Sequence, residues 1–304
     1  DPVRKETSLE TGLPVHNVMN VRNQLGGAAN VVANLVALGI RQIDLVGYCG
    51  DDGEGYELKR ALSRLPGVCT ASFFCVPDRR TFTYCKPILL EAEGPRELSR
   101  IDIKNDSPTP LSLSQRLAEA VAAVGELADV LIALEQTDLA ETGALTHAVR
   151  AELGALAQRR PAVPILADSR RGLRDFPRLN FKMNGAELAS LTGMKDASDE
   201  CTVRSVVAEW SRSRGRSTFV TLAGSGMVAA DADGTISYAP ALPLRGRIDV
   251  VGAGDSVTAN VAVALAAGST TAEACHIAMA AASHTIHQIG TTGVASVDDI
   301  CALL

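Results

Sequence analysis

The feature that most constrains the fold of this chain is a repeated alternation of short apolar runs with helix-like stretches of small and apolar residues. The run 130–134 lies between helical patterns at residues 115–127 and 145–158, and a second apolar run follows at 165–167. Such alternation is typical of β-α-β units around a mainly parallel sheet with helices on both faces. We therefore expect a single α/β domain over residues 1–304, doubly wound, with helices flanking the sheet.

Residues 69–104 interrupt this alternation with short strand-like segments that have no helix between them. Together with residues 13–22, they predict a small β-sheet that stands off the main domain. An extra β-element of this kind is often only structural or a dimer surface. A lid over a ligand cleft is the more specific interpretation, because a lid excludes water from the chemistry.

Composition excludes several classes of function. The net charge of −6 argues against binding of nucleic acid or membrane through bulk positive charge. The polar start and the lack of a long apolar run predict a soluble protein with no membrane partner. Seven scattered cysteines without a C-x-x-C pair fit a reducing cytoplasm and indicate neither a disulfide framework nor a zinc site.

The strongest local motif is Gly252-Ala253-Gly254-Asp255, which opens an apolar helix. Two glycines allow a sharp turn, and the first N–H groups of a helix have no internal acceptor, so the turn suits a phosphate or a developing anion. Asp255 would be held beside that anion. The motif alone fits equally well a tight loop in which Asp255 only caps the helix.

A second glycine pair begins another helix of small residues, in Gly26-Gly27-Ala28-Ala29-Asn30. The Asn30 amide can offer a donor and an acceptor to a hydroxylated ligand. The chain has no G-x-x-x-x-G-K-[ST] segment, and neither glycine motif matches a full G-x-G-x-x-G after a strand. P-loop and Rossmann-type nucleotide sites are therefore disfavoured.

With these two motifs, nearly the whole chain resembles the PfkB (ribokinase-like) carbohydrate kinases. Within that family it is most similar to the kinases of D-glycero-D-manno-heptose 7-phosphate, in residues 26–31, 81–86 and 100–102. The resemblance implies a ribokinase-like three-layer αβα fold with a β-lid. It also implies transfer of the γ-phosphate of ATP to a hydroxyl of a sugar or sugar phosphate, with Mg²⁺, and a homodimer formed through the lid.

The resemblance also implies roles for the residues of the two glycine motifs. Asp255 would be the base that takes the proton of the sugar hydroxyl. The amides of Gly252, Ala253 and Gly254 would form an anion hole for the transferring group. The sugar hydroxyls would be bound by Gly26, Gly27 and Asn30, with Lys86 reaching in from the lid.

The nucleotide and metal roles fall on other segments. Asn184 and Glu187 match an N-x-x-E motif that organises Mg²⁺ and its waters near the ATP phosphates. Thr221, Gly224 and Gly226 match a nucleotide-binding turn, and the resemblance suggests a K⁺ site around Asp249 and the loop near Gly290. Each has a plainer interpretation, since Asn184 and Glu187 can form a capping pair and Lys86 can be a solvated charge.

The chain also departs from the family pattern. The first strand of the family, which ends in an aspartate that grips the sugar, is not found before Asp1. Val250, Ala223 and Tyr84 replace a threonine, a glycine and a lysine of the pattern. Residues 134–137 replace an S-D-Y-x-K-G segment of the heptose kinases, which weakens the transfer of their particular substrate.

Two other functions stay open at this point. The acceptor can be a different sugar or a nucleoside, such as fructose, ribose or adenosine. A nucleoside would need aromatic stacking, for which Phe73, Phe74, Phe82 and Tyr84 are the candidates. The chain can also be a non-catalytic sugar-binding protein of the same fold, although the intact Asp255 turn disfavours this.

Overall fold

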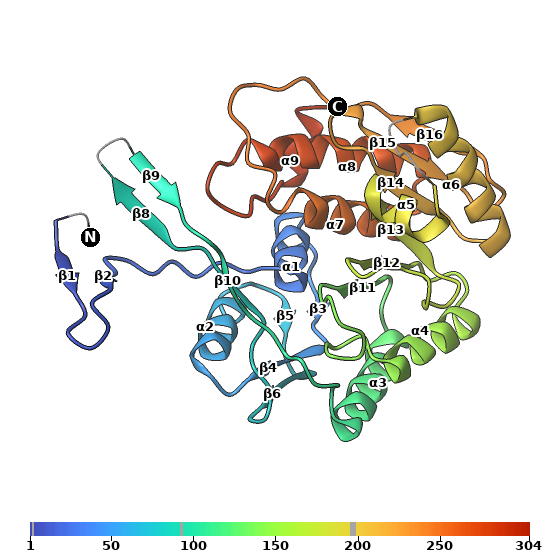
Figure 1. The fold of residues 1–304 in the computed structure, drawn as a ribbon. Coiled ribbons are helices and arrows are strands. Elements are labelled where there is room, and N and C mark those ends of the chain that lie inside the picture. Colours follow the sequence, from blue (N-terminus) through green and yellow to red (C-terminus); the bar gives the residue numbers. More distant parts are fainter. Residues whose placement is uncertain (2, 92–93, 195–198) are drawn as a thin grey trace.

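The centre of the protein is a six-stranded sheet in the order β11-β12-β13-β14-β15-β16 (Figure 1). The computed structural model describes residues 1, 3–91, 94–194 and 199–304. The strands are β11 (Leu131–Glu135), β12 (Ile165–Ser169), β13 (Asn180–Asn184), β14 (Thr218–Thr221), β15 (Met227–Ala230) and β16 (Ile236–Ala239). Neighbours from β11 to β14 pair in parallel, whereas β14, β15 and β16 pair antiparallel. The expected mainly parallel sheet is confirmed, with an antiparallel edge.

Helices cover both faces of this sheet (Figure 1). One face packs against α3 (Leu111–Gly125), α4 (His147–Arg159), α5 (Gly185–Thr192) and α6 (Glu200–Arg214), and the other against α7 (Ala253–Ala266) and α8 (Thr271–Ile286), which α9 (Val297–Cys301) contacts. Ile165 and Ala167 belong to the first core and Leu166 to the second, because successive side chains of a strand alternate between faces. The three-layer αβα architecture is therefore confirmed.

The described ranges hold no helix that is both long and apolar enough to cross a lipid bilayer.

A second group of elements precedes the sheet in the chain. It contains α1 (Ala28–Ala37), α2 (Gly53–Leu62) and two parallel strand pairs, β3 (Ile43–Asp44) with β5 (Val68–Cys69) and β4 (Gly47–Gly50) with β6 (Phe73–Val76). Strands β5 and β6 were expected in the lid, but Val68 and Phe73 pack against the core of α1 and α2. Helix α1 packs against α7, which brings the two glycine-opened helices together.

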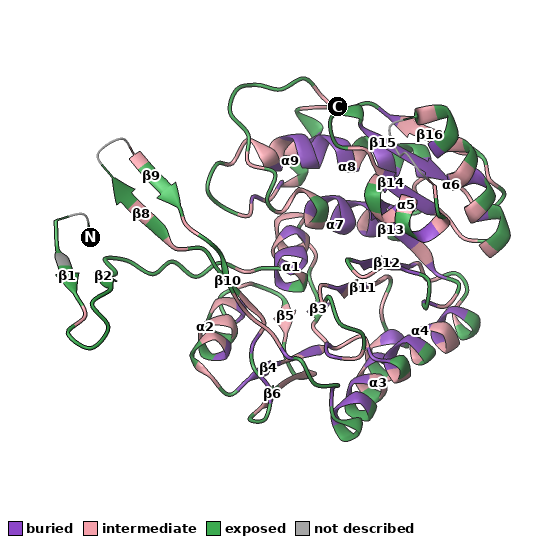
Figure 2. Ribbon diagram, in the orientation of Figure 1, coloured by how far each residue is buried: buried purple, intermediate pink, exposed green. Residues whose placement is uncertain are grey.

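The remaining strands form three pairs, two of which project from the body as arms (Figure 1). They are the antiparallel pairs β1 (Lys5–Thr7) with β2 (Pro14–His16), β7 (Thr83–Cys85) with β10 (Ile101–Ile103) and β8 (Ile88–Glu91) with β9 (Gly94–Glu97). Their residues are mostly exposed or half-buried (Figure 2). The expected small sheet is thus three separate strand pairs in the described part of the chain, and residues 92–93 of the expected lid range lie outside it.

Candidate active site

The start of α7 has the geometry of an anion-binding turn. Gly252 precedes the helix with a left-handed φ of 86°, and a Cβ at this position would lie 2.9 Å from Asn30 Nδ2. Only glycine therefore fits here. The Ala253 N–H donates to Val250 O at 3.2 Å, whereas the Gly254 N–H has no acceptor among the described residues. Of the amides that the sequence assigned to an anion hole, those of Gly252 and Gly254 thus have no acceptor in the described part of the chain.

Asp255, in the first turn of α7, is held by α1. Asn30 Nδ2 donates to Asp255 Oδ2 at 2.7 Å, and Asn30 is completely buried. Burial raises the pKa of Asp255, while the hydrogen bond from Asn30 and the charge of Lys182 oppose that rise. The Asn30 Oδ1 atom is buried and has no partner among the described residues, so it can accept from a ligand hydroxyl.

A buried ion pair that was not predicted lies beside this turn. Lys182 of β13 and Asp168 of β12 are both buried, with Nζ and Oδ2 2.9 Å apart. Burial opposes the Lys182 charge, but Asp168 outweighs it and the pKa of Lys182 is raised, so the ammonium stays charged. Thr258 Oγ1 donates to Asp168 Oδ2 at 2.9 Å and lies 3.0 Å from Gly254 O.

The same lysine faces the anion turn directly. A Cβ added to Gly254 would lie 3.3 Å from Lys182 Nζ, so the ammonium sits against the backbone that would receive an anion. The sequence held a signal for this residue, since Lys182 stands between the apolar residues Phe181 and Met183, which are both buried in β13. Lysine is almost never buried without a partner or a task.

Asn184 and Glu187 form the capping box of α5. Asn184 Oδ1 accepts from the Glu187 N–H at 2.9 Å, and Glu187 Oε2 accepts from the Asn184 N–H at 2.8 Å. The plainer interpretation of this pair is therefore realised. Glu187 nevertheless lines the cleft, and burial raises its pKa, which the nearby Asp168 carboxylate raises further against the hydrogen bond from Asn184. The Glu187 and Asp168 side chains carry the oxygen ligands that a hydrated Mg²⁺ ion prefers.

The predicted nucleotide turn follows β14. Thr221 ends that strand, and a 3₁₀ turn at Ala223–Ser225 leads to Gly226. Gly226 has a φ of 93°, and a Cβ there would lie 2.2 Å from Ala239 O, so glycine is required. Ala223 also has a left-handed φ, 49°, at the position where the family pattern has glycine. This turn, with Gly224 at its centre, is not among the residues that line the cleft.

Asp249 joins two loops near the start of α7. Its carboxylate accepts from the N–H groups of Val251 and Gly290, each at 3.1 Å. Gln24 Nε2 lies 3.3 Å from Gly290 O. The carboxylate is thus bonded to the loops that the sequence assigned to a K⁺ site, which leaves backbone carbonyls as the ligands that such an ion would use.

The part of the cleft that the sequence assigned to the sugar is lined by α1 and by the predicted lid strand β7. Gly27 has a φ of 52°, and a Cβ there would lie 3.2 Å from the side chain of Gln136, which follows β11. Lys86, expected to reach the sugar, instead pairs with Glu97 at 3.6 Å in this structure. Tyr84 Oη lies 3.5 Å from Gln136 O and 3.4 Å from Nη1 of Arg170, a second residue that sequence reasoning missed.

These groups line one open cavity of about 3700 Å³, which also extends along the N-terminal arm and α3. Of the predicted site residues, the cleft is lined by Gly26, Gly27, Lys86, Glu187, Asp249, Gly252, Gly254 and Asp255, and Asp168, Arg170 and Lys182 join them. The half-buried carboxylate of Asp255, the free helix-start amide of Gly254 and the buried ammonium of Lys182 lie together at one end. This arrangement can accept a proton and stabilise charge that develops on a transferred anion.

Comparison with solved structures agrees with this geometry. Ribokinase from Arabidopsis thaliana, complexed with ribose and ATP, matches with a TM-score of 0.72 at 20% identity, over 95% of this chain and 90% of that one. Phosphofructokinase-2 from Escherichia coli, in complex with substrates and products, matches with a TM-score of 0.71 at 18% identity, over 91% and 86% of the two chains. At these identities the likeness establishes the fold.

Curated sequences extend the comparison. The bifunctional protein HldE of Azorhizobium caulinodans is 34% identical over 88% of this chain and 54% of its own length, and that of Rhodospirillum rubrum is 32% identical over 97% and 58%. The chain thus spans little more than half the length of these relatives. The model of the pfkB family of carbohydrate kinases matches residues 1–297. The chain therefore belongs to the pfkB carbohydrate kinase family.

Proposed function

We propose that this sugar kinase transfers the γ-phosphate of ATP to a hydroxyl of a sugar phosphate, with Asp255 as the base. The observation that carries the proposal is the 2.7 Å hydrogen bond from Asn30 to Asp255. It joins the helix that begins at the glycine pair to the helix that begins as an anion-binding turn. A hydroxyl bound at Asn30 is therefore next to the carboxylate that would accept its proton.

The chemistry asked of this chain is positioning and charge stabilisation. ATP with Mg²⁺ supplies the phosphoryl group when bound, and phosphoryl transfer leaves little covalent work to the protein. The Gly254 amide and the Lys182 ammonium lie where negative charge would develop. Asp255 accepts the proton, and burial, which raises its pKa, makes it a stronger base than an exposed aspartate.

For the acceptor we propose a heptose 7-phosphate or a similar sugar phosphate. The likeness to HldE supports it, although only over the part of those relatives that the chain spans. A nucleoside acceptor is less favoured. Phe73 and Phe74, two of the four candidate stacking residues, are taken up in hydrophobic packing.

The test is an ATP-consumption assay with a panel of sugars, sugar phosphates and nucleosides, with Asp255→Asn as the matched control. The proposal expects turnover that is highest with a sugar phosphate and that the control lacks. Turnover with a nucleoside alone would replace the acceptor assignment. Binding of sugars without ATP consumption by the wild type would favour the non-catalytic alternative.

Two finer parts of the proposal concern ions and assembly. Backbone carbonyls near Asp249 and Gly290 would hold K⁺, so replacing K⁺ by Li⁺ in the assay is expected to lower kcat.

The exposed strand pairs β8–β9 and β1–β2 have open edges that a second copy would cover. Light scattering is expected to give a dimer, and a strict monomer at high concentration would contradict this.

A further inference from the structure

Arg170 is a cation in the cleft that has no carboxylate partner within ion-pair distance in the described ranges. Its guanidinium lies 5.8 Å from the centre of the Tyr84 ring. Arg100 and Lys104 also approach that ring, at 4.4 and 5.9 Å, but both already pair with carboxylates, Arg100 with Asp102 and Lys104 with Asp102 and Asp138. Of the three cations around Tyr84, Arg170 is thus the one whose charge is available.

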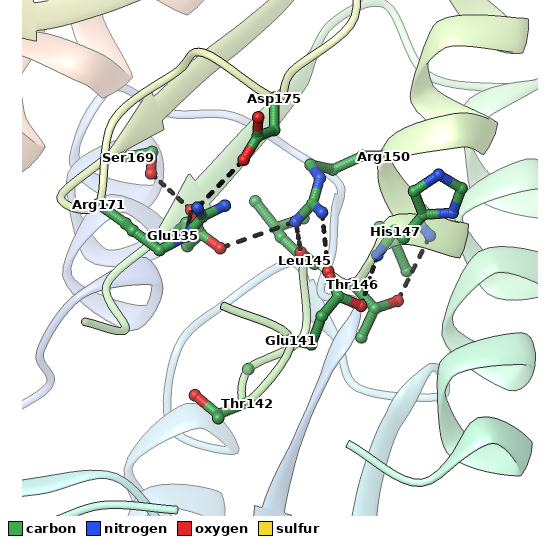
Figure 3. A network of polar contacts seen from close by, with 12 residues as sticks. Glu135, Glu141, Thr142, Leu145, Thr146, His147, Arg150, Ser169, Arg171 and Asp175 are labelled. Atoms are coloured by element: carbon green, nitrogen blue, oxygen red, sulfur yellow. Dashed lines mark hydrogen bonds and ion pairs between the residues drawn. The ribbon is translucent and has the colours of Figure 1, made fainter. Parts of the chain in front are cut away.

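The residues on both sides of Arg170 belong to a network of polar contacts around Glu135, in which Figure 3 labels Ser169 and Arg171. Glu135, at the end of β11, accepts from Ser169 Oγ at 2.5 Å, and its carboxylate lies 3.6 Å from Arg171 Nε and 4.0 Å from Arg150 Nη1. These partners hold the residues on both sides of position 170. The Arg170 N–H itself donates to Glu135 O at 2.9 Å.

The network is itself fixed to the start of α4. Figure 3 shows Arg150 between Glu135 and Glu141, with Arg150 Nη2 2.7 Å from Glu141 Oε1 and Nη1 donating to Leu145 O at 2.6 Å. Arg171 is further bonded to Asp175 at 3.3 Å. Glu135 and Arg150 are buried, so a loss of charge at Glu135 removes one of the two carboxylate partners of each arginine in a medium where that is costly.

The surroundings of Arg170 belong to the acceptor side of the cleft. Tyr84 comes from the lid strand β7, and its hydroxyl lies near Gln136 O, while the Gln136 side chain lies over Gly27. The Arg170 charge also reaches two carboxylates of the cleft, since it opposes the rise in the pKa of Asp255 and of Glu187. An anion held at Arg170 would thus lie between the lid and the site where the acceptor hydroxyl reacts.

We propose that Arg170 binds the phosphate group that the acceptor sugar already carries, and that the Glu135 network presents Arg170 for this task. A guanidinium suits this role because its planar donors can bind two phosphate oxygens at once. The inference rests on the proposed function and deepens it, since it assigns the residue that distinguishes a sugar phosphate from the free sugar.

The test compares Arg170→Met and Arg170→Lys with the wild type, using ATP and two acceptors, a heptose 7-phosphate and the same heptose without phosphate. We expect Arg170→Met to raise KM for the phosphorylated acceptor by roughly tenfold or more, which is typical of a lost bond to a charged group. KM for ATP and for the free heptose should stay unchanged, and Arg170→Lys should recover part of the loss. The exposed Arg64→Gln is the matched control and should change nothing.

Two outcomes overturn the assignment. A rise in KM for ATP alone would place Arg170 at the nucleotide, and equal losses with both acceptors would show that it does not read the phosphate. Calorimetric binding of the heptose 7-phosphate to wild type and Arg170→Met separates this inference from the proposed function. Binding that depends on Arg170 without turnover would contradict only the kinase reaction with this acceptor.

Glu135→Gln tests the positioning part. This variant keeps the shape of the side chain but removes its charge. We therefore expect KM for the phosphorylated acceptor to rise about one third as much as in Arg170→Met, while KM for the free heptose stays unchanged. Thermal melting of the same variant reports the structural cost. A lower melting temperature with an unchanged acceptor KM would show that Glu135 only stabilises the fold.

Discussion

Helices α5 and α7 place a carboxylate at the same distance from their start but use it differently. In α5, Glu187 stands three residues after the cap residue Asn184 and closes a reciprocal capping box. In α7, Asp255 stands three residues after Gly252, which has no side chain to reciprocate, and its carboxylate accepts from Asn30 of α1 instead. Burial raises the pKa of both acids. Replacing the cap side chain with glycine thus leaves one carboxylate open to a ligand and to another helix.

The difference between the two helices is tested most directly at Asp255, the carboxylate that does not close a capping box. Asp255→Asn is expected to lower kcat by roughly 10²–10⁴-fold while ATP binding is kept, because only the proton acceptor is lost. Steady-state kinetics and nucleotide titration measure this. Near-normal turnover would refute the assignment of the base.

The thermal stability of the same variant gives a second test, which does not depend on activity. Because burial raises the pKa of Asp255 in the folded state, ionisation of this group destabilises the fold as the pH rises above 3.8, its unfolded value. Asp255→Asn should therefore unfold at a higher temperature than wild type at neutral pH, with the gain vanishing below that value. Equal melting temperatures at both pH values would contradict the effect of burial.

Glu187→Gln sharpens the comparison at the other helix. Glutamine can still close the capping box, so α5 should remain as stable as in the wild type. Activity is nevertheless expected to fall about 10–100-fold, with a higher Mg²⁺ requirement, because a charged partner of the metal is lost. An Mg²⁺ titration of kcat measures this. Full activity would mean that Glu187 is only a cap.

Asn30→Ala tests the bond between the two glycine-opened helices. The Asn30 amide stabilises the ionised form of Asp255, so its loss raises the pKa of that carboxyl further. The acid limb of the kcat profile is expected to move to higher pH by about one unit, the worth of a hydrogen bond to a charge. Asn34→Ala, one turn along α1 and bonded to Asn30 O, is the control and should leave the limb in place.

The smallest expected effect concerns the predicted nucleotide turn after β14, where alanine takes a left-handed conformation that glycine takes at Gly252 before α7. Ala223 occupies a left-handed φ of 49°, which costs a non-glycine residue about 1–2 kcal/mol. Glycine has more conformational entropy than alanine in the unfolded chain, which offsets part of this gain. Ala223→Gly should therefore raise the free energy of unfolding by about 0.5–1 kcal/mol. Ala232→Gly is the control, because Ala232 has an ordinary φ, and it should not stabilise the protein. If chemical denaturation gives the same change in the free energy of unfolding for both variants, Ala223 is not strained.

The sequence predicted what depends on neighbours along the chain. The glycine pairs, the helices that follow them and the capping pair at Asn184 are local patterns, and each appears where expected. The bond between Asn30 and Asp255 spans 225 residues and could be placed only by a family resemblance. The Ala253 amide was assigned to the anion hole, but its bond to Val250 O depends on how the loop before α7 closes.

The unpredicted residues share a physical reason. Asp168, Arg170 and Lys182 lie on or just beyond strands that are neighbours only because of the order of the sheet. No spacing in the sequence brings β12 and β13 beside α7. The lid was misplaced for a related reason, because an isolated short strand gives no sign of its partner, and β6 pairs with β4 rather than with the arms.

The hydroxyl of Thr258 has a consequence for changing the substrate of this enzyme. It connects the Asp168 carboxylate at the end of β12 to the Gly254 carbonyl at the start of α7. Arg170 follows two residues after Asp168. The Thr258 hydroxyl therefore links the segment that would select the acceptor to the turn that would hold the transferred group. A graft that exchanges residues 168–171 for those of another kinase would therefore alter turnover together with selectivity, unless Asp168 is kept.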